Sequence, residues 1–249
     1  MRDEKGPGTR SALLVWLVGL ALGIAAGALT ANTFLANRFR CGTREHAQRL
    51  VREGVRLARQ AAAEQAEPPL VLGSVGPLGR VVGGELTPAD AEAAFAEVMQ
   101  ACAEAGADGV AIETMPSVAE AAAALAAARR ARLPAIVCLA RERAEAAELA
   151  EFARAMEDGG AAAIGVNCMS GPAAAPPLAA ALAAVTRLPV AVRPNAGFPQ
   201  RVDGLPRWRL RPEWFVARLT DAHAAGASVL GGCCGVGPAL QERRLQRQS

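Results

Sequence analysis

The segment Val229-Leu230-Gly231-Gly232-Cys233-Cys234-Gly235 places two adjacent cysteines between glycines at the end of a short apolar run. Neighbouring side chains of a strand point to opposite faces, so adjacent cysteines can serve one site only where the strand ends and the backbone turns. The flanking glycines permit such a turn, because they adopt conformations that other residues avoid. Converging thiolates are soft ligands suited to zinc. The segment therefore predicts a metal site at the end of a strand.

A third cysteine, Cys168, also follows an apolar run. The chain has 2 histidines, and both fall in stretches with a helical pattern. Three thiolates without an obvious fourth protein ligand suit a catalytic zinc with an open coordination position, whereas a structural zinc site takes four protein ligands. A vicinal disulfide between Cys233 and Cys234, or ordinary burial, is the alternative. We expect Cys168, Cys233 and Cys234 to bind the metal.

Apolar runs alternate with helical patterns along most of the chain. Seven runs are predicted to form strands, at residues 28–34, 70–72, 109–112, 134–139, 162–166, 189–192 and 228–230. Helices are predicted between them, at residues 45–64, 87–105, 117–131, 143–158, 177–185 and 212–225. This alternation predicts an α/β fold with a parallel sheet, and continuously apolar strands predict burial of both faces. Eight such strands close a (β/α)8 TIM barrel.

Composition favours one large α/β domain. The chain has 249 residues, of which 52% are hydrophobic and 4% aromatic. Its net charge of +3 is thinly spread, so no nucleic-acid partner is expected. Six cysteines do not look like a disulfide framework in a chain of this size, and reduced thiols favour the cytoplasm. Cys41, Cys102 and Cys138 are expected to be small buried apolar residues.

The N-terminal stretch from residue 11 to residue 31 carries no charged side chain. It is long enough for a membrane helix, and its charged leader also resembles that of a signal peptide. The alternative is a buried helix over residues 12–26 followed by an inner strand, which we favour. Three regions are expected: an atypical N-terminal segment with an apolar helix at 1–27, a barrel domain at 28–240 and a basic tail at 241–249.

Polar residues collect at or just past the C-terminal ends of the predicted strands. They include Asn32, Thr33, Ser74, Glu113, Asn167, Cys168, Asn195, Cys233 and Cys234. In a barrel these strand ends form a single face, where active sites are built. In an open doubly wound sheet they would be strung out in a line. A barrel therefore explains the pattern more simply.

Several of these residues suggest a thiol substrate. An open position on a thiolate-rich zinc suits a substrate thiol, because the metal favours the deprotonated nucleophile. A buried Glu113 is costly unless paired, so we expect it to receive the ammonium of an amino-acid substrate, or else to cap a helix or form a salt bridge. Asn195 is expected to offer its carbonyl oxygen near the metal, or to be a turn residue. Arg193 and the arginines around Trp208 are expected only to decorate a loop.

Six short segments resemble the homocysteine S-methyltransferase family, which includes the homocysteine-binding domain of methionine synthases and the betaine- and S-methylmethionine-dependent enzymes. The segments are 30–38, 73–77, 112–114, 165–168, 193–197 and 231–235, and the resemblance spans about residues 28–238. It implies a (β/α)8 barrel with zinc on the three cysteines and the homocysteine sulfur as exchangeable ligand. It also implies that Glu113 holds the substrate amino group, that the backbone near Ser74 meets the carboxylate and that Asn195 lies beside the metal. Asn32 is a further candidate for substrate binding.

The chain also departs from this family. It lacks the opening Asp-Gly-(Gly/Ala)-Met-Gly-Thr-like motif, so the first strand of the barrel is expected to be missing or altered. The connection after Leu139 also looks short. We expect a zinc-dependent methyltransferase that converts homocysteine to methionine, with a small-molecule or protein-borne methyl donor. The alternative is a catalytically weakened zinc- or thiol-binding relative, anchored to a membrane through residues 11–31 if that stretch spans one.

Overall fold

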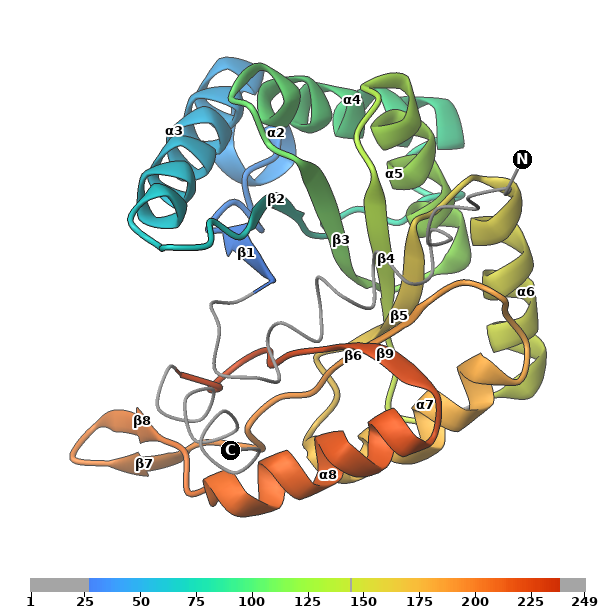
Figure 1. The fold of residues 1–249 in the computed structure, drawn as a ribbon. Helices are drawn as coiled ribbons and strands as arrows, with labels where there is room; N and C mark the ends of the chain where they lie inside the picture. Colours follow the sequence, from blue (N-terminus) through green and yellow to red (C-terminus); the bar gives the residue numbers. More distant parts are fainter. Residues whose placement is uncertain (1–26, 144, 238–249) are drawn as a thin grey trace, which may run out of the picture.

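A curved parallel sheet of seven strands forms the centre of the computed structural model, which describes residues 27–143 and 145–237 (Figure 1). The strands are β1 (Ala28–Ala31), β2 (Leu70–Val75), β3 (Gly109–Met115), β4 (Ala135–Ala140), β5 (Ala163–Asn167), β6 (Val190–Arg193) and β9 (Ala227–Leu230). They lie in the order β1-β2-β3-β4-β5-β6-β9, and each neighbouring pair is parallel. The predicted parallel α/β sheet is confirmed. Among the described residues β1 and β9 do not pair, so the sheet is an incomplete (β/α)8 barrel.

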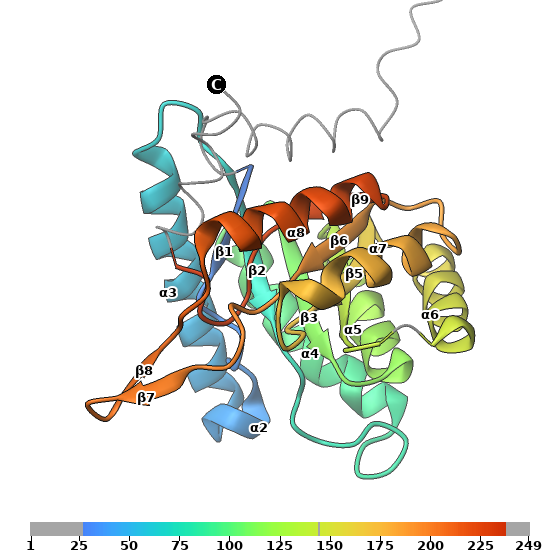
Figure 2. The same ribbon diagram turned by 90° about the horizontal axis from the view of Figure 1, so that it is seen from below.

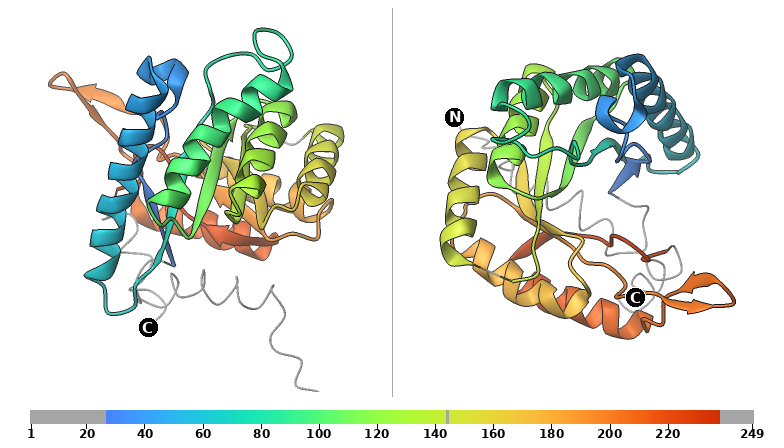
Figure 3. Two further views of the ribbon diagram at one scale, coloured as in Figure 1. Left: turned by 90° about the horizontal axis from the view of Figure 1, so that it is seen from above. Right: turned by 180° about the vertical axis from the view of Figure 1, so that it is seen from behind.

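Helices cover the outer, convex side of this sheet (Figures 1 and 3). They are α2 (Arg38–Cys41), α3 (Arg44–Ala63), α4 (Pro88–Glu104), α5 (Val118–Arg130), α6 (Ala146–Asp158), α7 (Ala175–Ala183) and α8 (Pro212–Ala224), with the 3-10 turn η2 (Pro172–Ala174) before α7. Thr43, Thr87 and Ser117 each cap a helix, because each side chain accepts a hydrogen bond from the backbone amide three residues later. The short helix α2 was not predicted.

The main core lies between the sheet and the helices, and its largest fully buried side chains include Phe95, Phe152 and Ile112. Successive side chains of a strand alternate between faces, so the opposite face carries a second, smaller cluster. Its buried members are Cys138, Ala163, Ala191 and Val229. Cys102 and Cys138 are buried, as predicted, whereas Cys41 is only partly buried.

The predicted first strand is too long, because β1 ends at Ala31 rather than at Phe34. The backbone turns directly after it, and the amide of Thr33 donates to the carbonyl of Ala31 at 2.8 Å. The hydroxyl of Thr33 then donates to the carbonyl oxygen of Ser74 at 2.7 Å and accepts from the Ser74 amide at 3.0 Å. These two bonds fix the turn against the end of β2.

A hairpin formed by β7 (Gln200–Val202) and β8 (Leu205–Arg207) projects from the body of the molecule (Figure 2). It was not predicted. Its two turn residues, Asp203 and Gly204, have φ angles of 52° and 75°. Positive φ at both central residues is typical of the tight turn that Asp-Gly favours between antiparallel strands. The dipeptide was therefore a readable signal.

The last residues of the predicted N-terminal apolar run lie in the central sheet. Residues 28–31 of the apolar run form β1 as a strand, but among the described residues β1 pairs only with β2 and is partly exposed, so it is an edge strand and not the expected inner strand. The expected helix at 12–26 and the basic tail at 241–249 lie outside the described residues. Within the described ranges, no helix combines the length and the apolar character needed to cross a membrane.

Candidate metal and substrate site

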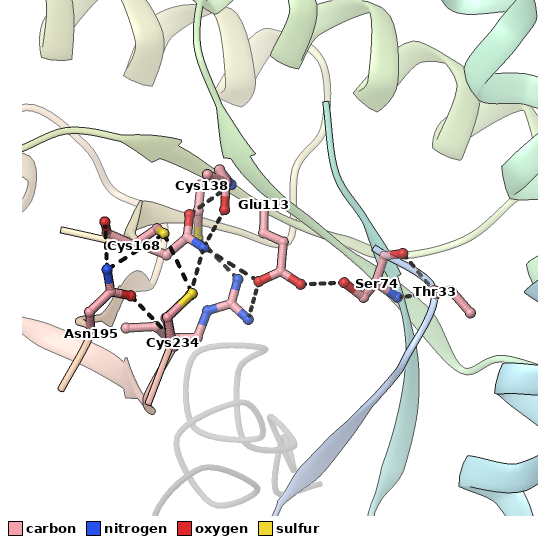
Figure 4. Close-up of polar contacts among 11 residues, drawn as sticks. Thr33, Ser74, Glu113, Cys138, Cys168, Asn195 and Cys234 are labelled. Atoms are coloured by element: carbon pink, nitrogen blue, oxygen red, sulfur yellow. Dashed lines mark hydrogen bonds and ion pairs between the residues drawn. The ribbon is translucent and has the colours of Figure 1, made fainter. Parts of the chain in front are cut away.

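The three cysteines predicted to bind metal come together at the C-terminal ends of β5 and β9, and Figure 4 shows Cys168 and Cys234 side by side. The sulfur atoms of Cys168, Cys233 and Cys234 lie within 4.8 Å of one another, and those of Cys168 and Cys234 are 4.0 Å apart. Around a tetrahedral zinc with Zn–S bonds of 2.3 Å, sulfurs are separated by about 3.8 Å. The cluster therefore fits one ion with only small side-chain movements. No disulfide links the six cysteines, all of which lie in the described ranges, so the vicinal-disulfide alternative is absent.

Backbone hydrogen bonds hold the cysteine-bearing loops together. The amide of Cys233 donates to the carbonyl of Pro194 at 2.9 Å, and the amide of Cys168 donates to that of Arg193 at 3.1 Å. Cys168 has a φ of 60°, a conformation that non-glycine residues seldom adopt. Gly235, at φ 78°, provides the turn expected after the cysteine pair. The loops after β5, β6 and β9 thus form one unit.

Ionisation of the three thiols is disfavoured in the protein alone. Burial raises the pKa of Cys168, Cys233 and Cys234, and the charge of a neighbouring thiolate raises each pKa further. A thiolate is the form that binds metal, and a divalent cation at the cluster would offset the repulsion between three of them. The three sulfurs would therefore be thiolates together only when a cation is bound to them.

Asn195 joins the two halves of the cysteine cluster. Its Nδ2 donates to the carbonyl oxygen of Cys168 at 3.1 Å and lies 3.7 Å from the Cys168 sulfur. Its Oδ1 accepts from the backbone amide of Cys234 at 3.0 Å. The residue lies beside the cluster, as expected, but its carbonyl oxygen is engaged by the protein backbone.

A second asparagine, Asn167, connects the cluster to Glu113. It is fully buried, and its Oδ1 accepts from the amide of Thr114 at 2.7 Å. Its Nδ2 lies 3.8 Å from the sulfur of Cys233 and 3.4 Å from Oε2 of Glu113. Sequence reasoning placed Asn167 at a strand end without giving it a role. Its position immediately before Cys168 was the available signal.

Glu113 forms an ion pair with Arg193, at 3.1 Å between Oε2 and Nη1. The two side chains are 12% and 13% exposed. Nη2 of Arg193 lies 3.7 Å from the sulfur of Cys138. Burial opposes the charge of Arg193, but the neighbouring Cys138 and Glu113 outweigh it and raise the arginine pKa. The expectation that Arg193 only decorates a loop is wrong, because its guanidinium lies inside the site.

Ser74 is part of the same network, whereas Asn32 is not joined to it. The hydroxyl of Ser74 donates to Oε1 of Glu113 in a short hydrogen bond, and the residue is 4% exposed. Its backbone amide and carbonyl are both bonded to the hydroxyl of Thr33. Asn32 is exposed, and no hydrogen bond of its side chain to the site occurs among the described residues. The next residue, Thr33, contacts Ser74 instead. The sequence pattern does not show which of these two neighbours faces the site.

Comparison with known proteins gives a consistent result. The family model described as homocysteine S-methyltransferase matches residues 22–240. Methionine synthase from Mycobacterium tuberculosis is 32% identical over 86% of this chain, which spans only 20% of that protein. Betaine-homocysteine S-methyltransferase from Drosophila melanogaster is 29% identical over 79% of this chain and 70% of its own length.

A solved structure shares the fold. The metallated form of the homocysteine methyltransferase MmuM from Escherichia coli superimposes with a TM-score of 0.74, covering 96% of this chain and 84% of its own. The two sequences are 24% identical. This likeness establishes the common architecture.

Proposed function

Because this chain belongs to the homocysteine S-methyltransferase family, whose model matches most of its length, we propose that it methylates the thiol of homocysteine to give methionine. Cys168, Cys233 and Cys234 would hold a zinc ion. The observation that carries the proposal is the convergence of these three sulfurs within 4.8 Å, next to a shielded carboxylate.

Zinc held by three thiolates would supply the acidity that turns a bound thiol into a nucleophile at neutral pH. The protein itself positions the cysteines and Glu113 relative to one another. Asn195 fixes Cys168 relative to Cys234, and Asn167 fixes the distance between Cys233 and Glu113. In the transfer, a sulfur–carbon bond forms while the bond between the methyl carbon and its donor breaks, and the donor leaves with the electron pair.

Glu113 would bind the ammonium of homocysteine. Its carboxylate is held by Ser74 and is largely shielded from water, so that an added cation interacts with it strongly. Two methylene groups separate the sulfur of homocysteine from the carbon that bears its ammonium. Since Asn167 contacts both Glu113 and Cys233, the ammonium site and the sulfur site are adjacent, as a ligand of this length requires.

The methyl donor would be a small molecule or a methyl carrier held by another protein. The chain spans about a fifth of the methionine synthases it matches, so their full reaction is not transferred to it. Betaine, S-methylmethionine and methylcobalamin would represent the donor classes in an assay. Methionine formed from one of them identifies the class.

The test combines metal analysis with X-ray absorption of the full chain. We expect one equivalent of zinc, three sulfur ligands without homocysteine and a fourth sulfur after homocysteine is added. Methionine formation from a donor panel then tests turnover. Zinc bound without any response to homocysteine would overturn the proposal.

A second candidate is a zinc- and thiol-binding protein without turnover. The open edge between β1 and β9 in the described residues and the prior engagement of Glu113 by Arg193 favour it. A fourth sulfur on the metal, with no methionine from any donor, would support this candidate over the enzyme.

A further inference from the structure

Two backbone amides near Ser74 are already engaged and are not free to receive the substrate carboxylate. The amide of Ser74 already donates to the hydroxyl of Thr33 at 3.0 Å, and the amide of Gly76 donates to the carbonyl of Phe34 at 3.0 Å. Both donors are therefore satisfied within the protein. A carboxylate at this site needs another partner.

Arg193 has the donors that such a carboxylate requires. Arginine presents five N–H groups in a planar fork that fits a carboxylate with two parallel hydrogen bonds. Nη1 of Arg193 is used by Glu113, and within residues 27–143 and 145–237 the contact of Nη2 is the long one of 3.7 Å to the Cys138 sulfur. Nε is buried and has no hydrogen-bond partner in the part of the chain that the structure describes. A buried donor in this state is costly, so the guanidinium has capacity for an anionic acceptor.

We propose that Arg193 binds the carboxylate of the substrate while Glu113 binds its ammonium, so that the pair selects thiols that are α-amino acids. This inference rests on the proposed function of the cysteine cluster. An α-amino acid carries both charges on one carbon, and Glu113 and Arg193 present the complementary charges side by side at 3.1 Å. The Glu113–Arg193 pair has no net charge. It favours a zwitterionic ligand over a ligand with a single charge, because a singly charged ligand leaves either Glu113 or Arg193 buried without a partner.

Three thiols separate the contributions of the two charged groups. Homocysteine carries both groups, 3-mercaptopropan-1-amine lacks the carboxylate, and 4-mercaptobutanoate lacks the ammonium. Each is titrated into the cobalt-loaded protein, in which sulfur coordination is followed by the thiolate-to-cobalt absorption. The readout is a dissociation constant and does not depend on a methyl donor.

The variant Arg193→Met is expected to bind homocysteine roughly 10- to 100-fold more weakly, the range for loss of a charged hydrogen bond. It should also lose affinity for 4-mercaptobutanoate, but bind 3-mercaptopropan-1-amine at least as well as before, because Glu113 is released. Glu113→Gln should show the reverse: weaker binding of homocysteine and 3-mercaptopropan-1-amine, and binding of 4-mercaptobutanoate at least as tight as in the parent protein. Arg52→Met removes a surface arginine paired with Glu104 and should leave all three constants unchanged.

The alternative role for Arg193 is a simple counter-ion that the substrate ammonium displaces. In that case Arg193→Met would tighten homocysteine and 3-mercaptopropan-1-amine equally, which overturns the inference. Where the methionine variant does not fold, Arg193→Lys keeps the charge without the fork: the inference predicts weaker binding of homocysteine and 4-mercaptobutanoate, whereas unchanged constants for all three thiols would support the counter-ion role. An absence of spectral change with every thiol in the unmodified protein would overturn the proposed function itself, a result distinct from the first.

Discussion

The side chain of Asn195 donates to Cys168 at 3.1 Å through Nδ2 and accepts from the amide of Cys234 at 3.0 Å through Oδ1. One side-chain amide thus bridges two loops whose cysteines are 66 residues apart in sequence but 4.0 Å apart between their sulfurs. The geometry of the cluster depends on this link as well as on the cysteines themselves.

Replacement of Asn195 by alanine should weaken zinc binding about 10- to 100-fold, the usual cost of losing a group that orients a ligand. Competition with a chromogenic chelator measures the constant. Asn37→Ala, which removes a cap from α2 far along the chain from the cluster, serves as the control. Equal affinity in the Asn195 variant and the parent protein would show that the loops hold their positions without the side chain.

Removal of a proposed ligand should have a larger effect. Cys234→Ser is expected to abolish zinc retention through gel filtration, because a hydroxyl is a far poorer ligand for zinc than a thiolate. Cys41→Ser changes a cysteine outside the cluster and should retain the full metal content. Atomic absorption gives the stoichiometry. One full equivalent of zinc in the Cys234 variant would place the metal elsewhere.

The small residue at position 165 is required where β5 approaches β6. A methyl group at Gly165 would overlap the backbone carbonyl oxygen of Ala191, which cannot move without breaking the sheet. Gly165→Ala should lower the free energy of unfolding by about 3 kcal/mol, the upper end of the usual range for overpacking, because the backbone it meets cannot move aside. Urea denaturation followed by circular dichroism measures it. Gly171→Ala, whose added methyl meets no atom closer than 3.9 Å, should change stability little.

Glu120 should make the stability of the fold depend on pH. It is 2% exposed and accepts from the amide of Leu78 at 2.8 Å. Burial raises the pKa of its carboxyl. A raised pKa in the folded state means that its contribution is fully present below the unfolded pKa and is lost as pH rises through the folded value.

Glu120→Gln keeps an oxygen acceptor for the Leu78 amide without a charge. The variant should therefore be more stable than the parent at pH 8, by an amount on the order of 1 kcal/mol. The difference should shrink near pH 4, where the carboxyl of the parent is protonated. Thermal melts at both pH values test this, and an unchanged difference would exclude titration of Glu120 as its source.

Much of the fold could be read from the sequence because apolar strands and amphipathic helices alternate with distinct periods. The strand ends also located Glu113, Asn195 and the three cysteines, since parallel strands bring their C-terminal ends to one edge. The partner of Glu113 could not be read in this way. Whether Arg193 turns inward or towards solvent depends on packing by residues far away in sequence.

Other misses have different causes. The hairpin at Asp203-Gly204 has a local sequence signal, because Asp-Gly favours a tight turn between antiparallel strands. Asn32 lies near the C-terminal end of the predicted first strand, and period-two alternation does not settle whether it or its neighbour Thr33 faces the site. The bonds of Thr33 to the backbone of Ser74 decide it, and such a contact between two strands has no counterpart in local sequence.

The cysteine cluster also has a consequence for the chain as a whole. Cys168 and Cys234 are 66 residues apart, and the polypeptide between them builds two helices and the last two strands of the sheet. An ion bound by both cysteines would act as a removable cross-link over that length. Its binding free energy would add to the free energy of unfolding of this part of the chain. Chelators should then behave towards this protein as denaturants do, lowering its melting temperature in proportion to how firmly they compete for the ion.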